Sequence, residues 1–523
     1  MTTLPLAFEI WFSNASKLKR FLAMTGAGVA AALAMAPYYL LPLLVLGYSL
    51  LLLALDTTVQ SKRRLREAFF IGWQFGFGFF LVGLYWLAFS FFVQAEEFAW
   101  MAPFAVTGMP AFLALFFGVA ALVIVRLWRA GPMRVVVFTI IWVIFEYARG
   151  HVLTGLPWNL PGQALAGTAA GAQSVAWYGV YGLSLVTVLL AVMPVMLKDP
   201  SGKINFRRGL IASFCGFLAL FALGWLRLAI NAPEDHDQVL VRIVQPNISQ
   251  KEKIDPSFWG RNLETLLAAS QNVPPAIEKS FVIWPENAVP IIDESQEALS
   301  LIDQTLPKNT ILVTGAVRRS TNVQGDVSYF NAINFIPWTQ DGRRAVAFYD
   351  KHHLVPFGEY LPFQGFLRSI GLAQLAPYES GFTKGAGPQT FNLGGPEFAP
   401  LICYEAIFPG VLYPREKRPE WLLTVTNDAW FGDTAGPRQH LDQARLRAIE
   451  TGLPMARSAN TGISAMIDGS GRYRHKLPLY SAGFIDSELP KSLPPTLYAR
   501  FGDKIFLIML LLMGGAAVLL PKS

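Results

Sequence analysis

Cysteine and charged residues are both scarce in this 523-residue chain. Charged residues make up 15% of the sequence and hydrophobic residues 53%, whereas typical soluble proteins carry about 25% charged residues. This composition excludes an intrinsically disordered chain, which needs low hydrophobicity and high charge. Length and hydrophobicity together argue against a single soluble globule. The only two cysteines, Cys215 and Cys403, fall in different composition regimes and are not expected to form a disulfide.

The basic and acidic residues are unevenly distributed, and this decides what the formal net charge of +7 means. Residues 231–503 hold 25 Lys and Arg against 29 Asp and Glu, a net charge of −4. The remaining residues hold 18 against 7, a net charge of +11. A basic chain can indicate nucleic-acid binding, but here the positive charge belongs to the apolar part. We therefore expect no nucleic-acid partner.

The apolar part contains uncharged segments long enough to cross a membrane, because a bilayer core needs about 20 apolar residues per helix. We predict eight transmembrane helices, at 21–35, 38–55, 68–92, 101–127, 134–148, 173–196, 208–230 and 504–520. Fifteen of the 18 basic residues in this part lie in loops or termini on one side of that arrangement. Since cytoplasmic loops are rich in Lys and Arg, both termini are predicted to be cytoplasmic. No cleavable signal peptide is expected.

This topology predicts three domains. They are a membrane domain with seven helices at 1–230, an extracytoplasmic domain at 231–502 and a last transmembrane helix within 503–523. In the extracytoplasmic domain, short apolar β-branched runs alternate with helical patterns, which indicates an α/β or α+β sandwich. Strands are predicted at 239–244, 281–284, 311–314, 332–336, 345–349, 399–403, 422–426 and 463–467. Helices are predicted at 258–270, 297–304 and 441–451.

Three residues of the extracytoplasmic domain lie where predicted strands end. Cys403 ends one apolar run, and a nucleophile on a rigid strand end can be exposed beside a backbone amide that faces an oxyanion. Glu286 follows another strand, and a carboxylate in an apolar site can act as the base that a thiol needs. Lys351 follows a third, and a nearby lysine favours the thiolate and can neutralise an oxyanion. Each residue alone also fits an ordinary structural role.

Glu286, Lys351 and Cys403, in this order, resemble the catalytic triad of the nitrilase (carbon–nitrogen hydrolase) superfamily over about residues 238–489. The matching motifs are Trp-Pro-Glu-Asn-Ala at 284–288, Lys-His-His-Leu-Val-Pro-Phe-Gly-Glu at 351–359, Cys-Tyr-Glu at 403–405 and Asn-Asp-Ala-Trp-Phe at 427–431. With eight membrane helices around this domain, the whole chain resembles the apolipoprotein N-acyltransferase family of the bacterial envelope. The resemblance implies a nitrilase-like αββα sandwich on the periplasmic side of the inner membrane.

The resemblance also implies a reaction. An acyl chain would pass from a phospholipid, phosphatidylethanolamine being the expected donor, to the N-terminal α-amino group of the diacylglyceryl-cysteine of an apolipoprotein, the last step of lipoprotein maturation. Cys403 would attack the sn-1 ester to form a thioester, which the amine then attacks. Glu286 would carry the protons, and Lys351 with the backbone amide after Cys403 would hold the oxyanion. Glu359, Glu405 and Tyr404 would line the site, the two carboxylates orienting Lys351.

Apolar residues near these motifs suggest where lipid could bind. Segment 361–382, which contains Phe363 and Phe366, is either an arm that touches the membrane surface and gates lipid entry or a helix packed on the domain. By the same resemblance, Trp430 and Phe431 would form part of a wall for the acyl chain, although they also fit a core.

The remaining polar candidates have structural interpretations. Glu146 and Arg149 lie near the outer end of helix 134–148, where we expect a local ion pair or hydrogen bonds to residues 158–159, although charge inside a membrane segment is often functional. His352 and His353 are adjacent and would point apart on an extended chain. No His, Cys and Asp cluster has ligand spacing, so no metal or diffusible cofactor is expected.

Three other functions compete with acyl transfer. A membrane-anchored nitrilase-like amidase would use the same triad, but a soluble substrate needs one anchor and not eight helices. A transporter would be expected to show inverted repeats and interrupted midplane helices, and the sequence shows no repeat. A non-enzymatic scaffold would leave the lone Cys403 thiol without an explanation.

Overall fold

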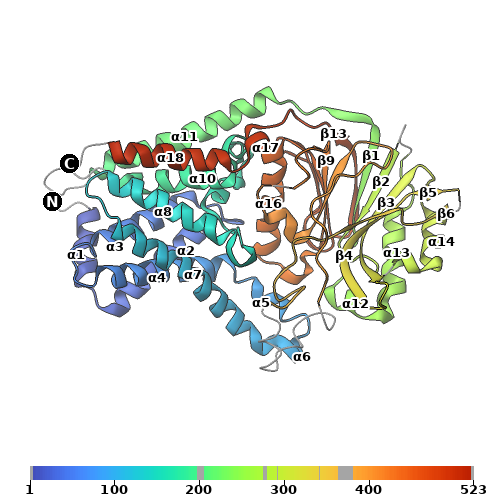
Figure 1. Ribbon diagram of the computed structural model, residues 1–523, viewed down its shortest axis with the longest axis horizontal. Helices are drawn as coiled ribbons and strands as arrows, with labels where there is room; N and C mark the ends of the chain where they lie inside the picture. The colour runs from blue at the N-terminus through green and yellow to red at the C-terminus, as the bar shows by residue number, and fades with distance from the viewer. Residues whose placement is uncertain are drawn as a thin grey trace. The chain divides into compact units, whose positions relative to one another are not determined.

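In the computed structural model, the chain divides into two compact units, each described here by itself (Figure 1). The structure describes residues 4–196, 205–274, 279–290, 292–340, 342–362, 381–410 and 412–519. The helical unit comprises Met1–Asn231, Thr434–Asp442 and Pro495–Ser523. The sandwich unit comprises Ala232–Asp433 and Gln443–Pro494.

The helical unit contains a helix in every range predicted to cross the membrane. Its main helices are α1 (Leu4–Asn14), α2 (Lys17–Ala32), α3 (Leu41–Asp56), α4 (Arg64–Gly83), α7 (Ala102–Arg126), α8 (Met133–Arg149), α10 (Val175–Val192), α11 (Phe206–Ile230) and α18 (Lys504–Leu519). Shorter ones are α5 (Leu87–Ser90), α6 (Ala95–Phe98), α9 (Ala169–Ala172) and α17 (Leu497–Phe501). Helix α1 was not predicted.

Within the described ranges, three helical segments are long and apolar enough to cross a membrane: Ala95–Arg126, Val175–Val195 and Phe206–Ile230. Leu41–Asp56 and Lys504–Ala516 are apolar but shorter. The helices therefore support a membrane protein, while the number of eight spans and their orientation remain predictions.

Close packing between helices explains the many glycines of this unit. A Cβ at Gly28 of α2 would collide with the backbone of Phe75 on α4, and one at Gly72 of α4 would collide with the backbone of Phe117 on α7. Small residues let membrane helices approach in this way. Trp142 of α8 lies in the aromatic core beside these helices, with its ring tilted against that of Phe117 at 4.4 Å between centroids, and donates a hydrogen bond to Tyr48 Oη at 3.1 Å.

The sandwich unit is built on two large sheets. The six-stranded sheet has the order β13-β1-β2-β3-β4-β7 and the five-stranded sheet the order β12-β11-β10-β9-β8. The strands of the first are β1 (Asp235–Gln245), β2 (Lys279–Trp284), β3 (Thr310–Thr321), β4 (Val327–Ile336), β7 (Ala347–Asp350) and β13 (Gly483–Pro490). Those of the second are β8 (Phe398–Ile402), β9 (Trp421–Thr426), β10 (Met455–Ala459), β11 (Ala465–Ile467) and β12 (Tyr473–Lys476). A short hairpin pairs β5 (Trp338–Thr339) with β6 (Gly342–Arg343).

Apolar residues from both sheets form one core between them. Ile243 and Phe281 of the six-stranded sheet pack in the same cluster as Trp421, Val425 and Met466 of the five-stranded sheet. A second cluster joins the other face of the six-stranded sheet to helices α13 (Trp259–Ser270) and α14 (Gln296–Thr305). Residues 443–451 of α16 (Ala435–Thr451) lie on the five-stranded side (Figure 1). These layers agree with the predicted α/β sandwich.

All eight predicted strands are present, with one difference that matters for the site. Strand β8 ends at Ile402, one residue before the predicted end, and Cys403 begins the 3₁₀ helix η8 (Cys403–Ile407). The backbone of Cys403 has a φ of 50°, a left-handed conformation that a non-glycine residue rarely adopts. The chain turns sharply there because the strand geometry stops at this residue.

Candidate active site

The three predicted catalytic residues each follow a strand of the sandwich unit. Glu286 lies two residues after β2, Lys351 directly after β7 and Cys403 directly after β8. The two sheets therefore contribute to one group of side chains. Lys351 Nζ lies 3.7 Å from Glu286 Oε1, and the Cys403 sulfur interacts electrostatically with both.

Lys351 is the centre of this group and is 1% exposed. Its ammonium contacts Glu359 Oε1 at 2.8 Å in addition to Glu286. The other Glu359 oxygen accepts a hydrogen bond from the Val355 amide at 2.8 Å. The Glu359 carboxylate is therefore held by the backbone of its own segment. Burial alone would lower the pKa of Lys351, but the negative charges of Glu359, Glu286 and Cys403 outweigh it and raise that pKa. Lys351 is therefore charged at neutral pH.

Asn331 of β4 joins the two carboxylates and was missed by the sequence prediction. Its side-chain amide donates to Glu286 Oε1 at 2.8 Å and to Glu359 Oε1 at 2.7 Å, and its backbone carbonyl accepts from the Lys351 amide at 2.9 Å. Asn331 is 1% exposed. Asn331 lies directly before the predicted apolar run 332–336. An asparagine in that place is a weak signal of function, because many buried asparagines only satisfy backbone groups.

Cys403 is held as a neutral thiol in the resting site. Burial raises the pKa of the thiol, and Glu286 and Asp428 raise it further, while Lys351 and a hydrogen bond with the Thr426 side chain oppose them. The thiol therefore needs a nearby base to become nucleophilic. Glu286 is the carboxylate with the largest electrostatic effect on it.

A second series of hydrogen-bonded polar side chains supports the Cys403 thiol from β9, and the sequence prediction missed it as well. Thr426, which hydrogen-bonds Cys403, donates to Asp428 Oδ1 at 3.0 Å. Asp428 Oδ2 in turn contacts Arg457 Nη2 of β10 at 2.9 Å, and both side chains are fully buried. Asp428 lies within the Asn-Asp-Ala-Trp-Phe motif, so its sequence signal was present but was assigned to the two aromatic residues.

Glu405 orders the backbone on both sides of the site. Its carboxylate accepts hydrogen bonds from the amides of His352 at 2.8 Å, His353 at 3.2 Å and Ile402 at 2.8 Å, and from Tyr349 Oη at 3.0 Å. Burial would raise the pKa of Glu405, but its hydrogen bonds and charge interaction with His352 lead the effects that lower it. Glu405 thus fixes the segment after Lys351 and the strand before Cys403, whereas Glu359 contacts the Lys351 ammonium.

The other predicted site residues have different surroundings. Tyr404 packs edge-on against His353 and Phe408, and His353 stacks on Phe408 at 3.7 Å. Trp430 and Phe431 lie on the short helix η9 (Asp428–Phe431), where Trp430 is 37% exposed and Phe431 half-buried. Phe363 and Phe366 lie outside the described residues. Within the ranges that the structure describes, no group of three or more His, Cys, Asp and Glu side chains could hold a metal ion.

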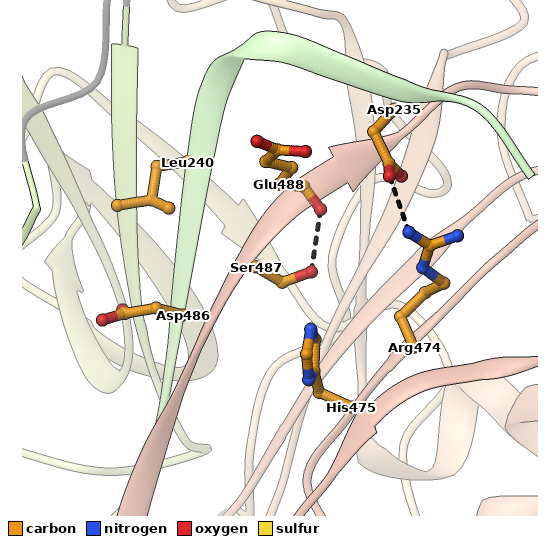
Figure 2. Close-up of a pocket in the computed structure, with 7 residues that line it drawn as sticks. All are labelled: Asp235, Leu240, Arg474, His475, Asp486, Ser487 and Glu488. Atoms are coloured by element: carbon orange, nitrogen blue, oxygen red, sulfur yellow. Dashed lines mark hydrogen bonds and ion pairs between the residues drawn. The ribbon is translucent and has the colours of Figure 1, made fainter.

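A surface pocket of the sandwich unit involves none of these residues. It is lined by Asp235, Leu240, Arg474, His475, Asp486, Ser487 and Glu488 (Figure 2). Arg474 Nη2 contacts Asp235 Oδ2 at 2.6 Å, and Asp486 pairs with Arg242 of β1 at 2.6 Å. The first ion pair joins β12 of the five-stranded sheet to β1 of the six-stranded sheet, and the second joins β1 to β13.

Two family models match the chain. The model of the apolipoprotein N-acyltransferase N-terminal domain matches residues 27–193, and the carbon–nitrogen hydrolase model matches residues 240–493. The second match assigns the carbon–nitrogen hydrolase fold to the sandwich unit. Among solved structures, a carbon–nitrogen hydrolase superfamily protein of Xanthomonas campestris is similar at 19% identity, with a TM-score of 0.33, covering 49% of this chain and 91% of that one. An amidase of Nesterenkonia is similar at 16% identity, with a TM-score of 0.34, covering 53% and 99%.

Curated relatives match over nearly the whole length. The apolipoprotein N-acyltransferase of Rhodopseudomonas palustris is 40% identical over 91% of this chain and 90% of its own. That of Bradyrhizobium diazoefficiens is 38% identical over 93% and 92%, and that of Caulobacter vibrioides 39% identical over 93% and 92%. Both family models and these full-length matches agree, so the chain belongs to the apolipoprotein N-acyltransferase family.

Proposed function

We propose that this chain transfers an acyl group from a phospholipid to the N-terminal α-amino group of an apolipoprotein, with Cys403 as the nucleophile. The observation that carries the proposal is the half-buried Cys403 thiol in one charge cluster with Glu286 and Lys351. Matches to apolipoprotein N-acyltransferases over more than nine-tenths of the chain support the class of acceptor. Acyl transfer is the chemistry that such a nucleophile, base and cation can perform together.

In the first half-reaction, Glu286 takes the proton from the Cys403 thiol, and the sulfur attacks the carbonyl carbon of the phospholipid ester. The negative charge that develops on the carbonyl oxygen is stabilised by the Lys351 ammonium and by the backbone amide after Cys403. The ester C–O bond then breaks, and the departing oxygen of the lysophospholipid takes the proton from Glu286. The acyl group remains on Cys403 as a thioester.

In the second half-reaction, the acceptor amine attacks the thioester carbon. Glu286 takes the proton from the amine, the same oxyanion forms, and the C–S bond breaks as the amide is made. The thiolate recovers its proton from Glu286, which restores the resting site. One base therefore serves both steps, because each step begins with the removal of one proton from the nucleophile.

Three residues hold these groups in place. Asn331 donates to both carboxylates around Lys351, and Glu359 keeps the ammonium aligned at 2.8 Å. Glu405 fixes the backbone beside Lys351 and Cys403 through three backbone amides and also accepts from the Tyr349 hydroxyl. Rigid positioning of this kind lowers the cost of reorganisation during the reaction.

The membrane arrangement is part of the proposal. We infer eight transmembrane helices with both termini in the cytoplasm, a membrane domain at 1–230, a periplasmic catalytic domain at 231–502 and a last helix within 503–523, in the inner membrane of a bacterium. The helices found in every predicted range and the charge asymmetry of the loops support it. Reporter fusions test it: a fusion after residue 503 should be active in the periplasm and one at residue 523 in the cytoplasm.

The donor and its entry route are proposed from the same resemblance. We expect phosphatidylethanolamine to be a donor, Trp430 and Phe431 to contact its acyl chain, and the segment 361–382 to touch the membrane surface. Phe363→Ser with Phe366→Ser should slow lipid turnover and spare folding. An unchanged turnover rate would remove the gating role.

The main test measures acyl transfer with purified protein in detergent, a phospholipid donor and a synthetic diacylglyceryl-lipopeptide acceptor. Cys403→Ala should abolish the N-acylated product detected by mass spectrometry. Cys215→Ser is the matched control, because Cys215 is an exposed cysteine of α11 and should not matter. Normal product from Cys403→Ala would refute the proposal, and ammonia released from small amides with no acylated peptide would favour the amidase.

A further inference from the structure

A second lysine reaches the same group of residues from a different element. Helix α12 (Gln250–Ile254) begins at Ser249, whose hydroxyl accepts from the Glu252 amide while the Glu252 carboxylate accepts from the Ser249 amide. Lys253, in its last turn, donates from Nζ to the backbone carbonyl of Glu286 at 2.7 Å. Its neighbour Lys251 is exposed. Lys253 itself is half-buried, so the two lysines of one short helix differ in exposure.

The charges around Lys253 come from the catalytic group. Its ammonium interacts with Glu286 and Cys403. The nearest acidic residues in sequence are engaged elsewhere, since Glu252 pairs with Arg261 and Asp255 caps the Ser257 amide at 2.9 Å. Burial lowers the pKa of Lys253, and the charges of Glu286 and Cys403 oppose it, so that the value is about 8. Lys253 is therefore mainly charged at neutral pH and mainly neutral well above pH 8.

We propose that Lys253 is a positioning residue of the acyl-transfer site, which holds the Glu286 segment by its main-chain carbonyl and supplies a second positive charge to Cys403 when the thiolate forms. The inference rests on the proposed role of Cys403 as nucleophile. Lys253 acts separately from Lys351, which follows β7 and is already engaged by Glu359 and Glu286.

The charge balance of the site explains why a second cation is useful. Before the reaction Glu286 is an anion near Lys351. When Glu286 takes the thiol proton, the negative charge moves to the Cys403 sulfur, while Glu359 still occupies the Lys351 ammonium at 2.8 Å. Asp428 adds further negative charge near the sulfur, although Arg457 pairs with it. Lys253 interacts with Cys403, which gives the proton, and with Glu286, which takes it. Its positive charge therefore favours the state in which Cys403 is a thiolate.

The test follows alkylation of Cys403 by iodoacetamide in the full-length protein carrying Cys215→Ser, as a function of pH. Alkylation joins the sulfur to the reagent carbon and releases iodide, so its rate reports the thiolate without lipid or acceptor. Lys253→Gln keeps a donor for the Glu286 carbonyl and removes the charge. Lys253→Arg keeps the charge, and Lys251→Gln is the control from the same helix.

Lys253→Gln should alkylate about tenfold more slowly near pH 7, because a nearby positive charge lowers the pKa of a thiol by about one or more. The difference should shrink to about twofold or less near pH 9, where Lys253 of the parent protein has lost its charge. Lys253→Arg should match the parent near pH 7 and alkylate about fivefold faster near pH 9, because arginine keeps the charge that Lys253 has lost there. Lys251→Gln should equal the parent at every pH.

Equal alkylation of Lys253→Gln and the parent at every pH would overturn the inference. A decrease of the same size at every pH would also overturn it, because it would show a structural tether without an electrostatic role. Should Lys253→Gln fail to fold, faster alkylation of Lys253→Arg than of the parent near pH 9, with equal rates near pH 7, supports the role of the charge. Equal rates of the two proteins at every pH reject it. Acyl transfer by Cys403→Ala would instead refute the proposed function, which this alkylation assay does not measure.

Discussion

The helical unit and the candidate active site bury charge in different ways. In the helical unit, Arg149 and Glu146 of α8 form a pair at 2.5 Å with both side chains fully buried, and Arg149 also donates to the Leu156 carbonyl. In the sandwich unit, the single ammonium of Lys351 faces the two carboxylates of Glu286 and Glu359. The first arrangement is balanced one to one, whereas in the second two carboxylates share the Lys351 ammonium beside a thiol.

The difference separates structural from chemical use of buried charge. In a balanced pair each charge offsets the cost of burying the other, and Arg149 also holds the loop after the helix. This agrees with the predicted local ion pair. An unbalanced cluster leaves one carboxylate able to accept a proton without leaving the cation unpaired. We therefore expect mutations in the first to change stability and mutations in the second to change the rate.

The largest effect is expected from breaking the unbalanced cluster. Glu286→Gln removes the base that takes the thiol proton, and Lys351→Met removes the cation that stabilises the oxyanion. Each should lower acyl transfer by about a thousandfold or more, because the thiolate and the oxyanion form only during the reaction. Product formation by mass spectrometry and folding by thermal unfolding are measured together. Glu294→Gln, an exposed carboxylate paired with Arg319, is the control. Loss of folding in step with loss of rate would make these residues structural.

Breaking the balanced pair should act on stability. Glu146→Gln leaves Arg149 buried without a negative partner, which should cost about 3–5 kcal/mol of unfolding free energy. The double variant Glu146→Leu with Arg149→Met removes both charges and should recover much of that loss. The remaining folded protein should form the Cys403 adduct at the parent rate. A slower adduct with unchanged stability would give this pair a catalytic role.

The smallest effect concerns Glu405 and depends on pH. The pKa of Glu405 is lowered in the folded protein. The carboxylate therefore stabilises the fold at pH values above its pKa in the unfolded chain, about 4.3. This contribution is lost as the pH falls through the lower pKa of the folded protein. Glu405→Gln should lower stability by about 1–3 kcal/mol near neutral pH. Its stability should also change less between neutral and acidic pH than that of the parent. Parallel pH profiles of unfolding would contradict this.

The sequence predicted the elements that carry continuous apolar runs and missed those that mix polar residues into a buried strand. Strand β10 contains the buried Arg457 and Ser458, and β13 alternates around Asp486 and Glu488, so neither shows a clear apolar signal. Both are stabilised by partners that are distant in sequence, such as Asp428 for Arg457.

The same reason explains which parts of the site could be predicted. Glu286, Lys351 and Cys403 are recognisable because each follows an apolar strand within a distinctive motif. Lys253 lies in the polar stretch Gln250–Ile254, and its contact with the Glu286 carbonyl exists only after folding. The left-handed backbone of Cys403 likewise depends on the end of β8 at Ile402, which the predicted strand did not show.

The central claim is that Cys403 carries the acyl group, and one measurement tests it directly. Purified protein is incubated with phosphatidylethanolamine labelled in its acyl chain, without acceptor, and the protein is analysed for label. The account predicts a hydroxylamine-sensitive acyl adduct on Cys403 of the parent protein and none in Cys403→Ala. A parent protein that takes no label, or equal labelling of the Cys403→Ala variant, would contradict it.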